Sequence, residues 1–280
     1  MNSKKSYPIA LSIAGSDSSG GAGIQADLKT FSSLGVYGTT AITAITAQNT
    51  QGVHSQLAIA PQMVYDQIIA VMEDLNPSVV KIGMLSNSEI VCAVAEALSQ
   101  YQLPIILDPV IVSSSGHRLL SVEAQESVKE RLLPLSTLVT PNIPEIEALT
   151  SVTLSTHQDK ERAAHYLIDL GAKAILLKGG HEEGDTKSDT LFLASPTGIK
   201  ATTFSSQTIH TKNIHGTGCT LSAAIAAFIA RGESINEAIA KAKSYISDAI
   251  RAGADVVIGN GFGPVNHGFN PLKMVANERE

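Results

Sequence analysis

A glycine-rich tetrapeptide, Gly216-Thr217-Gly218-Cys219, opens a nearly all-apolar segment that extends to Ile229. Alanine and leucine around its whole circumference predict a helix buried within the protein. The amino end of such a helix presents free N–H groups and the positive end of the helix dipole, and glycines let a ligand approach the backbone closely. The segment therefore predicts a site for an anion such as phosphate; the alternative for the glycines is a tight turn.

The two cysteines of the chain stand in different surroundings. Cys219 lies at the start of the predicted helix, where we expect a lowered thiol pKa and a role as base or nucleophile; the alternative is a small core residue. Cys92 lies in an apolar run without a neighbouring glycine or charge, so we expect an inert core thiol. Two cysteines make no disulfide framework, which favours a cytoplasmic protein.

Four more polar residues follow predicted strands. Asp108 and Glu145 could hold Mg²⁺ directly or through water, since this ion keeps several waters and takes further ligands from substrate phosphates. The alternatives are turn formation for Asp108 and helix capping for Glu145. Lys178 could neutralise a phosphate, or it ends a strand in solvent. The amide of Gln48 offers a donor and an acceptor to the edge of an aminopyrimidine, or it is hydrogen-bonded within a buried turn.

Short apolar runs that alternate with amphipathic stretches predict the framework for these residues. The runs are rich in Ile, Val and Leu, as is typical of strands buried on both faces, and span residues 9–14, 39–47, 79–82, 105–107, 138–140, 174–177 and 191–193. Helical patterns span residues 23–34, 61–75, 89–100, 122–133, 159–170, 217–230 and 235–251. The alternation predicts an α/β fold with a mainly parallel central sheet and helices on both faces. No linker or repeat divides residues 1–280, so we expect a single domain.

Composition excludes several classes of protein. The 280 residues include 20 Lys+Arg and 26 Asp+Glu, which gives a net charge of −6. An acidic chain without a basic cluster repels a phosphate backbone, so we expect no nucleic-acid partner. No stretch reaches the ~18 apolar residues that span a bilayer, so we expect no membrane partner either. With 44% hydrophobic and 16% charged residues, the chain can bury a sizeable core.

Glycines and polar residues gather after the predicted strands, where ligands bind in open parallel sheets. Two familiar nucleotide-binding patterns are nevertheless incomplete. Residues 21–26 have the glycine spacing of a dinucleotide-binding turn, but no acid occurs between Asp27 and Asp66 to bind the ribose. Gly15 and Gly20 have P-loop spacing, but Gly21-Ala22 replaces the required Lys-Ser/Thr pair.

Eight short segments, which are distributed over nearly the whole chain, occur in the order that is typical of one enzyme family. They are Gly15-Ser-Asp-Ser-Ser-Gly-Gly-Ala-Gly-Ile-Gln-Ala-Asp-Leu-Lys-Thr-Phe31, Thr46-Ala-Gln-Asn-Thr50, Lys81-Ile-Gly-Met-Leu85, Asp108-Pro-Val110, Thr140-Pro-Asn-Ile-Pro-Glu145, Leu177-Lys-Gly-Gly-His181, Thr211-Lys-Asn-Ile-His-Gly-Thr-Gly-Cys-Thr-Leu-Ser222 and Gly261-Phe-Gly-Pro-Val-Asn-His267. In these segments the chain resembles the hydroxymethylpyrimidine/phosphomethylpyrimidine kinases of thiamine biosynthesis, members of the ribokinase-like superfamily. It departs from them at Ile214, where Thr is common, and at His117, where an acid or a small residue is expected.

The resemblance implies a ribokinase-like three-layer sandwich, usually a homodimer, that uses ATP and Mg²⁺. For the small-molecule substrate, Gln48 would bind the pyrimidine edge, Met84 would pack on the ring, and Asp27 and Gly15 would lie near the hydroxymethyl arm. Cys219 would be the base, behind the anion site of Gly216, Thr217 and Gly218. Asp108 and Glu145 would hold Mg²⁺ and, with Asn142, organise the ATP phosphates, while Lys178 and Lys212 would lie along the nucleotide.

The activity that the resemblance implies is phosphorylation of 4-amino-5-hydroxymethyl-2-methylpyrimidine and then of its monophosphate, which gives the pyrophosphate. A pyridoxal/pyridoxine kinase is the alternative, because pyridoxal also carries a hydroxymethyl group on a methylated nitrogen heteroaromatic. From other classes, a nicotinamide-dependent dehydrogenase would use residues 21–26, against which the missing ribose acid argues. A non-catalytic binding protein would not need both the carboxylate pair, Asp108 and Glu145, and the Gly-Thr-Gly-Cys segment.

Overall fold

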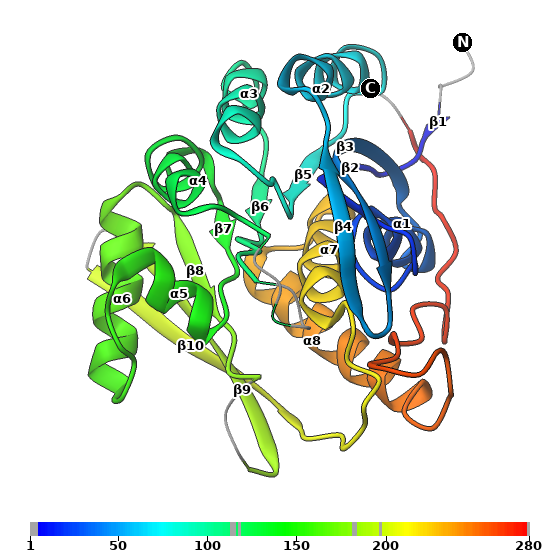
Figure 1. Ribbon diagram of the computed structural model, residues 1–280, viewed down its shortest axis with the longest axis vertical. Coiled ribbons are helices and arrows are strands. Elements are labelled where there is room, and N and C mark those ends of the chain that lie inside the picture. The colour runs from blue at the N-terminus through cyan, green and yellow to red at the C-terminus, as the bar shows by residue number, and fades with distance from the viewer. Residues whose placement is uncertain (1–4, 113–115, 117–118, 181–183, 196–197, 279–280) are drawn as a thin grey trace.

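The protein is described by a computed structural model that covers residues 5–112, 116, 119–180, 184–195 and 198–278. His117 and His181, named in the sequence analysis, lie outside the described residues. The central element is a nine-stranded sheet with the strand order β10-β9-β8-β7-β6-β5-β2-β3-β4 (Figure 1). A separate two-stranded pairing joins β1 (Lys5–Ser6) to β11 (Asn277–Glu278), near the two ends of the chain.

The middle of the sheet is parallel. Its six strands are β2 (Ile9–Asp17), β3 (Tyr37–Asn49), β5 (Val79–Ile82), β6 (Ile105–Leu107), β7 (Leu138–Val139) and β8 (Ala174–Leu177). Antiparallel strands complete both edges: β4 (Gly52–Ala58) on one side, and β9 (Thr186–Ser195) followed by β10 (Gly198–Gln207) on the other. The carboxyl ends of the six parallel strands therefore meet at one edge of the sheet, where the predicted ligand site lies.

Helices cover both faces of the sheet and divide the core in two. One face packs against α1 (Gly23–Ser33), α7 (Thr217–Ala230) and α8 (Ile235–Ala252). The other packs against α2 (Pro61–Asp74), α3 (Ser88–Leu98), α4 (Val122–Ser127), α5 (Ile143–Thr150) and α6 (His157–Asp169). Alternate residues of β2 face the two cores: Leu11 and Ile13 enter one, and Ala10 the other. The predicted α/β architecture in three layers is confirmed.

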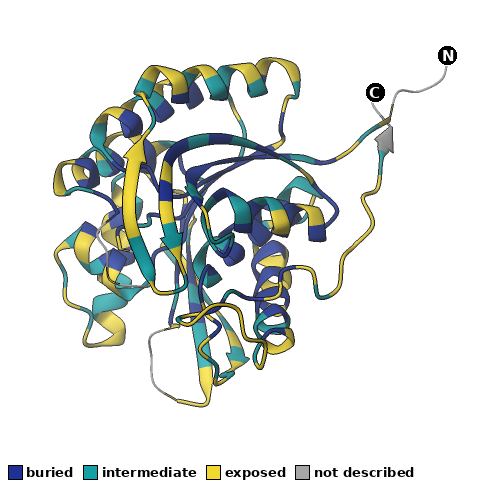
Figure 2. Cartoon of the chain, turned by 45° about the vertical axis from the view of Figure 1, so that its right-hand side comes forward, coloured by how far each residue is buried: buried dark blue, intermediate teal, exposed yellow. Residues whose placement is uncertain are grey.

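Strands β5, β6 and β8 and helix α7 have the predicted bounds. Residues 122–133 do not form one helix: α4 ends at Ser127, and the chain continues as a π-helical turn, Val128–Leu132, and a 3-10 turn, Leu133–Leu135, where Pro134 cannot continue an α-helix. Helix α5 was not predicted, because it is short and begins between Pro141 and Pro144. The edge strands β4 and β10 were missed because they are polar and exposed, without an apolar run (Figure 2).

Helix α7 is the most buried helix of the fold, as the sequence predicted. Residues 223–227 are fully inaccessible to solvent. Helices α1 and α8 pack along its sides and the sheet lies beneath it. Among the residues that the structure covers, no helix combines the length and apolar character needed to cross a lipid bilayer.

We expect Ser86→Gly to stabilise the protein. Ser86 adopts a left-handed backbone conformation (φ 73), and its buried hydroxyl has no hydrogen-bond partner among the described residues. Glycine relieves both the strain and the unsatisfied group, which outweighs its greater chain entropy, so thermal unfolding should show a gain of about 1–2 kcal/mol.

Ser151→Gly is the matched control for this variant. Ser151 has a similar φ of 57 but is exposed, so glycine there relieves the backbone strain alone. We expect a smaller gain than at Ser86. An equal or larger gain at Ser151 would mean that the buried hydroxyl of Ser86 carries no penalty.

Candidate active site

The site is built around a close backbone contact at the start of α7. Gly216 caps this helix with a φ of 78, and a Cβ at this position would lie 1.7 Å from the carbonyl oxygen of Gly21. Only glycine fits there, so the loop after β2 packs directly onto the helix N-terminus. In the first turn of α7, the N–H groups of Gly218 and Cys219 have no acceptor among the described residues, whereas that of Thr217 donates to Ile214 O at 3.2 Å. Free N–H groups at this helix start are what the predicted anion site requires.

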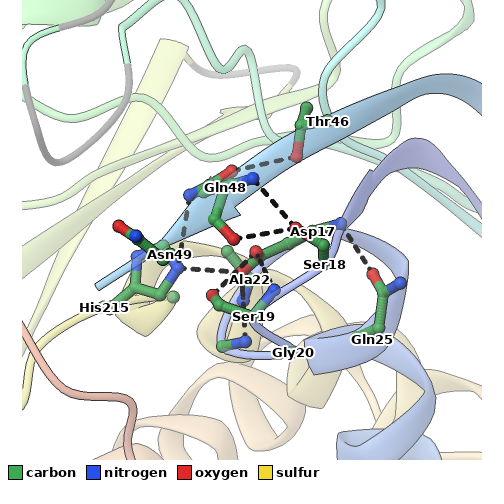
Figure 3. Close-up of polar contacts among 12 residues, drawn as sticks. Asp17, Ser18, Ser19, Gly20, Ala22, Gln25, Thr46, Gln48, Asn49 and His215 are labelled. Carbon is green, nitrogen blue, oxygen red and sulfur yellow. Dashed lines mark hydrogen bonds and ion pairs between the residues drawn. The ribbon is translucent and has the colours of Figure 1, made fainter. Parts of the chain in front are cut away.

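Asp17 organises the loop that packs on α7 (Figure 3). Its carboxylate accepts the backbone N–H groups of Ser19, Gly21 and Ala22 at 2.8–3.0 Å and lies 2.8 Å from Nε2 of His215. Burial alone would raise the pKa of Asp17, but the hydrogen bonds from His215, Ser19 and Ala22 hold it well below the ordinary value. The loop is therefore wrapped around a carboxylate that stays ionised.

The side-chain amide of Gln48 lies between Thr46 and His215 (Figure 3), and both contacts are long. Its Nε2 lies 3.4 Å from Nε2 of His215, which must carry a proton to donate to the ionised Asp17 and so cannot also accept one. The hydroxyl of Thr46 is 3.3 Å from Gln48 Oε1 but only 2.8 Å from its better acceptor, Ser16 O. Both ends of the amide are therefore available at the carboxyl end of β3.

Met84 supplies an apolar surface at the neighbouring strand ends. It is 7% exposed, clusters with Ala44 and Leu119, and is held by a 2.6 Å hydrogen bond from Thr43 Oγ1 to its carbonyl oxygen. A Cβ on Gly15 would lie 2.8 Å from Met84 Sδ, so this glycine allows the sulfur to approach the backbone of β2. The structure thus brings Gly15 and Met84 together, and their predicted contacts with the substrate stay predictions.

A charged cluster lies against the anion site. Lys178 Nζ is 2.9 Å from Asp108 Oδ1 and 3.8 Å from Glu145 Oε2. A Cβ on Gly218 would lie 3.4 Å from the Lys178 ammonium and 3.8 Å from Asp108 Oδ2, so the pair borders the first turn of α7 directly. The hydroxyl of Ser222 also donates to Asp108 Oδ2, at 3.1 Å.

The two carboxylates of this cluster titrate differently. Burial raises the pKa of Asp108, but the positive charges of Lys178 and Lys81 and the hydrogen bonds from Lys178 and Ser222 lower it. Together they outweigh the burial, so the pKa of Asp108 lies below its ordinary value. At Glu145, burial raises the pKa to about 7, because the attraction of Lys178 offsets the desolvation only in part. At neutral pH, Asp108 is thus ionised and Glu145 is ionised in part of the molecules.

Asn142 and Glu145 cap helix α5 reciprocally. Asn142 Oδ1 accepts the N–H of Glu145 at 2.8 Å, and Glu145 Oε2 accepts the N–H of Asn142 at 2.8 Å. The capping role considered as the alternative for Glu145 is therefore present. It does not remove the residue from the site, since the same carboxylate also faces Lys178.

Asp27 lies behind the site instead of lining it. It is fully buried, and its oxygens accept two hydrogen bonds from Lys81, at 2.8 and 3.0 Å, and one from Ser12, at 2.6 Å. Both oxygens of Asp27 are thus engaged within the protein, and its predicted place near the hydroxymethyl arm stays a prediction. Lys212 is exposed and forms no ion pair with the described residues, so the structure does not join it to the cluster.

Both cysteines differ from the expectation. Burial raises the pKa of Cys219 to about 11; the nearby Lys81 and the N–H of Gly23 lower it by less, while Asp27 and Asp108 raise it further. The predicted lowering is wrong because desolvation outweighs the charge of Lys81 and the hydrogen bond from Gly23. Cys92 is exposed, since Glu89 and Glu96, three and four residues away along α3, share its face of the helix.

Three residues of the site were missed in the sequence. Lys81 had the clearest signal, a charge inside the apolar strand β5. Asp17 and His215 lie in glycine-rich segments, from which only the glycines were interpreted as functional. Their pairing spans 198 positions of the chain. No local pattern reveals such a pairing.

Comparison with known proteins connects this geometry to an activity. Residues 17–266 match the profile of the phosphomethylpyrimidine kinase family. This chain belongs to that family. A hydroxymethylpyrimidine/phosphomethylpyrimidine kinase of Rhizobium meliloti is 47% identical over 260 residues, 92% of this chain and 96% of that protein. The thiamine biosynthesis bifunctional protein ThiED of Geobacter sulfurreducens is 48% identical over 95% of this chain, which spans about half (54%) of its length.

Solved structures confirm the ribokinase-like fold that the resemblance implies. The pyridoxal kinase of Staphylococcus aureus, in complex with AMP-PCP and pyridoxal, superposes with a TM-score of 0.84 at 30% identity, over 98% of this chain and 100% of that one. The chain is therefore a phosphotransferase of an ATP-dependent family. The individual site residues remain predictions.

We expect Cys92, and not Cys219, to react first with iodoacetamide at neutral pH. Cys92 is exposed, whereas the Cys219 thiol is protonated until the pH approaches about 11. Mass spectrometry of tryptic peptides should show that alkylation of Cys219 accelerates as the pH rises, in the wild type and in Cys92→Ser. Alkylation of Cys219 at pH 7 as fast as that of Cys92 would contradict this assignment.

Proposed function

We propose that this protein transfers the γ-phosphoryl group of ATP to the hydroxymethyl group of 4-amino-5-hydroxymethyl-2-methylpyrimidine and then phosphorylates the resulting monophosphate, in thiamine biosynthesis. The observation that carries the substrate assignment is the unused amide of Gln48. Its donor and acceptor match the amino group and ring nitrogen along one edge of an aminopyrimidine. Met84 provides an apolar surface for the ring.

Charge stabilisation is the main requirement of phosphoryl transfer, because charge spreads over the oxygens of the transferred group. We assign this role to the N–H groups of Gly218 and Cys219 at the start of α7, with the Lys178 ammonium beside them. Thr217 shapes this turn and does not itself donate to the anion, because its N–H is bound to Ile214 O. The donors are fixed before the substrate binds, so they need little reorganisation during the reaction.

Asp108 and Glu145 are the residues that would hold Mg²⁺. They fit this ion, which is commonly bound by one or two carboxylates together with phosphate oxygens and water. In the part of the chain that the structure covers, no group of three or more His, Cys, Asp or Glu side chains forms a closed cage. When bound, Mg²⁺ would neutralise phosphate charge. Asn142 would act on the nucleotide by keeping Glu145 in place through the capping pair.

The proton of the substrate hydroxyl must leave as the new P–O bond forms, and we assign its uptake to the thiolate of Cys219. With a pKa of about 11, only roughly 0.1% of the free protein carries this base at pH 8. The anion site therefore contributes more to the rate than the base does. Asp27 acts indirectly, because it holds Lys81, whose charge favours the thiolate.

A pyridoxal kinase is the second candidate, and one observation favours it. The pyridoxal kinase of Staphylococcus aureus matches 98% of this chain with a TM-score of 0.84. Backbone shape does not separate two activities that share a fold, whereas side chains do. The identities of 47–48% to thiamine-pathway relatives, against 30% to this pyridoxal kinase, support the pyrimidine as the main substrate.

We also propose a single kinase domain that works in the cytoplasm as a homodimer. A continuous nine-stranded sheet supports the single domain. The β4 edge supports self-association, since Ile45 and Leu57 pair across β3 and β4 and are 50% and 68% exposed. Static light scattering on the purified chain distinguishes the dimer from a monomer.

A coupled ADP-release assay tests the proposed function. Hydroxymethylpyrimidine, its monophosphate and pyridoxal are compared at equal concentration with Mg·ATP. We expect the highest kcat/KM with the pyrimidine alcohol, measurable turnover of its phosphate, and lower turnover of pyridoxal. Turnover of pyridoxal alone would replace the first candidate by the second.

Replacement of Gln48 by leucine tests the recognition of the pyrimidine edge. Gln48→Leu leaves the polar edge of a bound pyrimidine unpaired, at a cost of about 1–3 kcal/mol, so KM for the pyrimidine should rise ~5–150-fold while ATP affinity is kept. Gln51→Leu, an exposed neighbour, is the control and should behave as the wild type. A normal KM in Gln48→Leu would remove Gln48 from substrate recognition.

The pH dependence of turnover tests Cys219 as the base. A group with a pKa of about 11 gives up its proton as the pH rises, so kcat should increase about tenfold per unit between pH 7 and 10. Cys219→Ala should lose ~10²–10⁴-fold in kcat and the slope with it. Cys219→Asp should recover part of the rate without the slope, because a carboxylate is already ionised. Wild-type kcat in a folded Cys219→Ala variant would exclude the thiol from proton transfer.

A further inference from the structure

A further buried ion pair, between Lys243 and Asp189, has no role in the function proposed above. Lys243 of α8 donates to Oδ2 of Asp189, on β9, at 2.6 Å, and their side chains are 11% and 3% exposed. Asp189 Oδ1 accepts the backbone N–H of Gly179 at 3.0 Å. One carboxylate thus joins a helix, a strand and the residue that follows Lys178.

The backbone around Lys178 is held from both sides. Its own N–H donates to Pro141 O at 2.9 Å, next to a bridge between Lys178 and Asn142, and the following N–H, of Gly179, donates to Asp189. With both N–H groups fixed, the direction in which the Lys178 side chain leaves the backbone is set. This direction brings its ammonium within 2.9 Å of Asp108.

An ion pair is a costly way to satisfy one N–H group. Both charges lose their hydration, and a neutral Asn or Ser could accept the same hydrogen bond. A charged acceptor, however, holds an N–H more strongly than a neutral one. Lys243 also cancels the negative charge that Asp189 would otherwise bring near a phosphate. The pair is thus suited to hold the loop in place when a charged ligand pulls on Lys178.

We propose that Asp189, kept in place by Lys243, is a positioning residue for the contact between Lys178 and an ATP phosphate. This rests on the proposed function, which takes Lys178 as the residue that neutralises that phosphate. Asp189 acts through the N–H of Gly179 and touches no ligand. Its loss should weaken ATP binding and leave pyrimidine binding unchanged, because Gln48 and Met84 belong to β3 and to the segment after β5.

Two double variants separate positioning from simple stability. Asp189→Asn/Lys243→Met removes both charges but keeps an oxygen for the Gly179 N–H, whereas Asp189→Leu/Lys243→Met removes the acceptor as well. Calorimetric titration with Mg·ATP should show an affinity about threefold weaker than that of the wild type for the first, whose neutral acceptor holds the N–H less strongly, and about 10-fold weaker for the second. The KM for the pyrimidine should stay constant in both. Glu233→Gln/Lys241→Met, which removes a pair whose side chains are 26% and 49% exposed, is the control and should match the wild type.

Lys178→Met completes a mutant cycle that measures whether Asp189 acts on ATP binding through Lys178. In this background, Asp189→Leu/Lys243→Met should weaken ATP binding by less than about twofold further, because the loop no longer has a phosphate contact to position. Three results would each overturn the proposal. The folded Asp189→Leu/Lys243→Met variant could bind ATP as the wild type does, or both double variants could lose the same affinity. The third is a full additional 10-fold loss of ATP affinity when Lys178 is already replaced. Thermal unfolding establishes that each variant is folded, and Asp189→Ala/Lys243→Met replaces the Leu/Met variant if that one is not.

The titrations contain no pyrimidine, so the two proposals fail separately. A protein that binds ATP and responds to these variants as expected, but phosphorylates neither pyrimidine, refutes the proposed function and leaves the positioning role. Normal pyrimidine turnover with no response of ATP affinity refutes the positioning role alone.

Discussion

The contact between Gly216 and the carbonyl of Gly21 is the constraint on which the rest of the site depends. The loop after β2 packs onto the N-terminus of α7 there. The carbonyl oxygen of Gly21 lies so close to Gly216 that any side chain larger than hydrogen at position 216 would overlap it. The same loop carries Asp17, leads into α1 at Gly23 and is tied to Gln48 through Ser18. Anion site, substrate edge and helix start are therefore positioned together. A side chain at position 216 would separate all three.

Alternating charges make the buried polar centre tolerable. Asp27 pairs with Lys81 and Asp108 with Lys178, so two carboxylates and two ammonium groups cancel, and Glu145 remains as the group whose ionisation changes near neutral pH. Each pair costs desolvation, and removal of one partner would leave an uncompensated buried charge. The balance keeps the centre close to neutral, so the helix terminus and Lys178 can attract phosphate without strong repulsion from the carboxylates behind them.

Sequence reasoning succeeded where a property is local and failed where it depends on packing. Apolar runs gave β5, β6, β8 and α7 with their bounds, because a strand buried on both faces and a helix buried all round have unmistakable composition. Exposed edge strands carry no such signal. Cys92 was misjudged because its sequence neighbours are apolar, while its helical neighbours, Glu89 and Glu96, are exposed acids. The strand ends predict where the site lies, but its long-range pairs, such as Asp17 with His215, exist only in the folded chain.

The raised pKa of the Cys219 thiol follows from the buried charges around it and from its burial. A helix N-terminus favours a negative charge, and on that ground alone the sequence predicted a lowered pKa. In the structure, Asp27 and Asp108 already place negative charge around Cys219, and its surroundings are desolvated. An ionised carboxylate there would add to the negative charge that Asp27 and Asp108 already place around this position. A protonated thiol adds no negative charge there, and in the mechanism proposed above only its small thiolate fraction takes up the proton of the substrate hydroxyl.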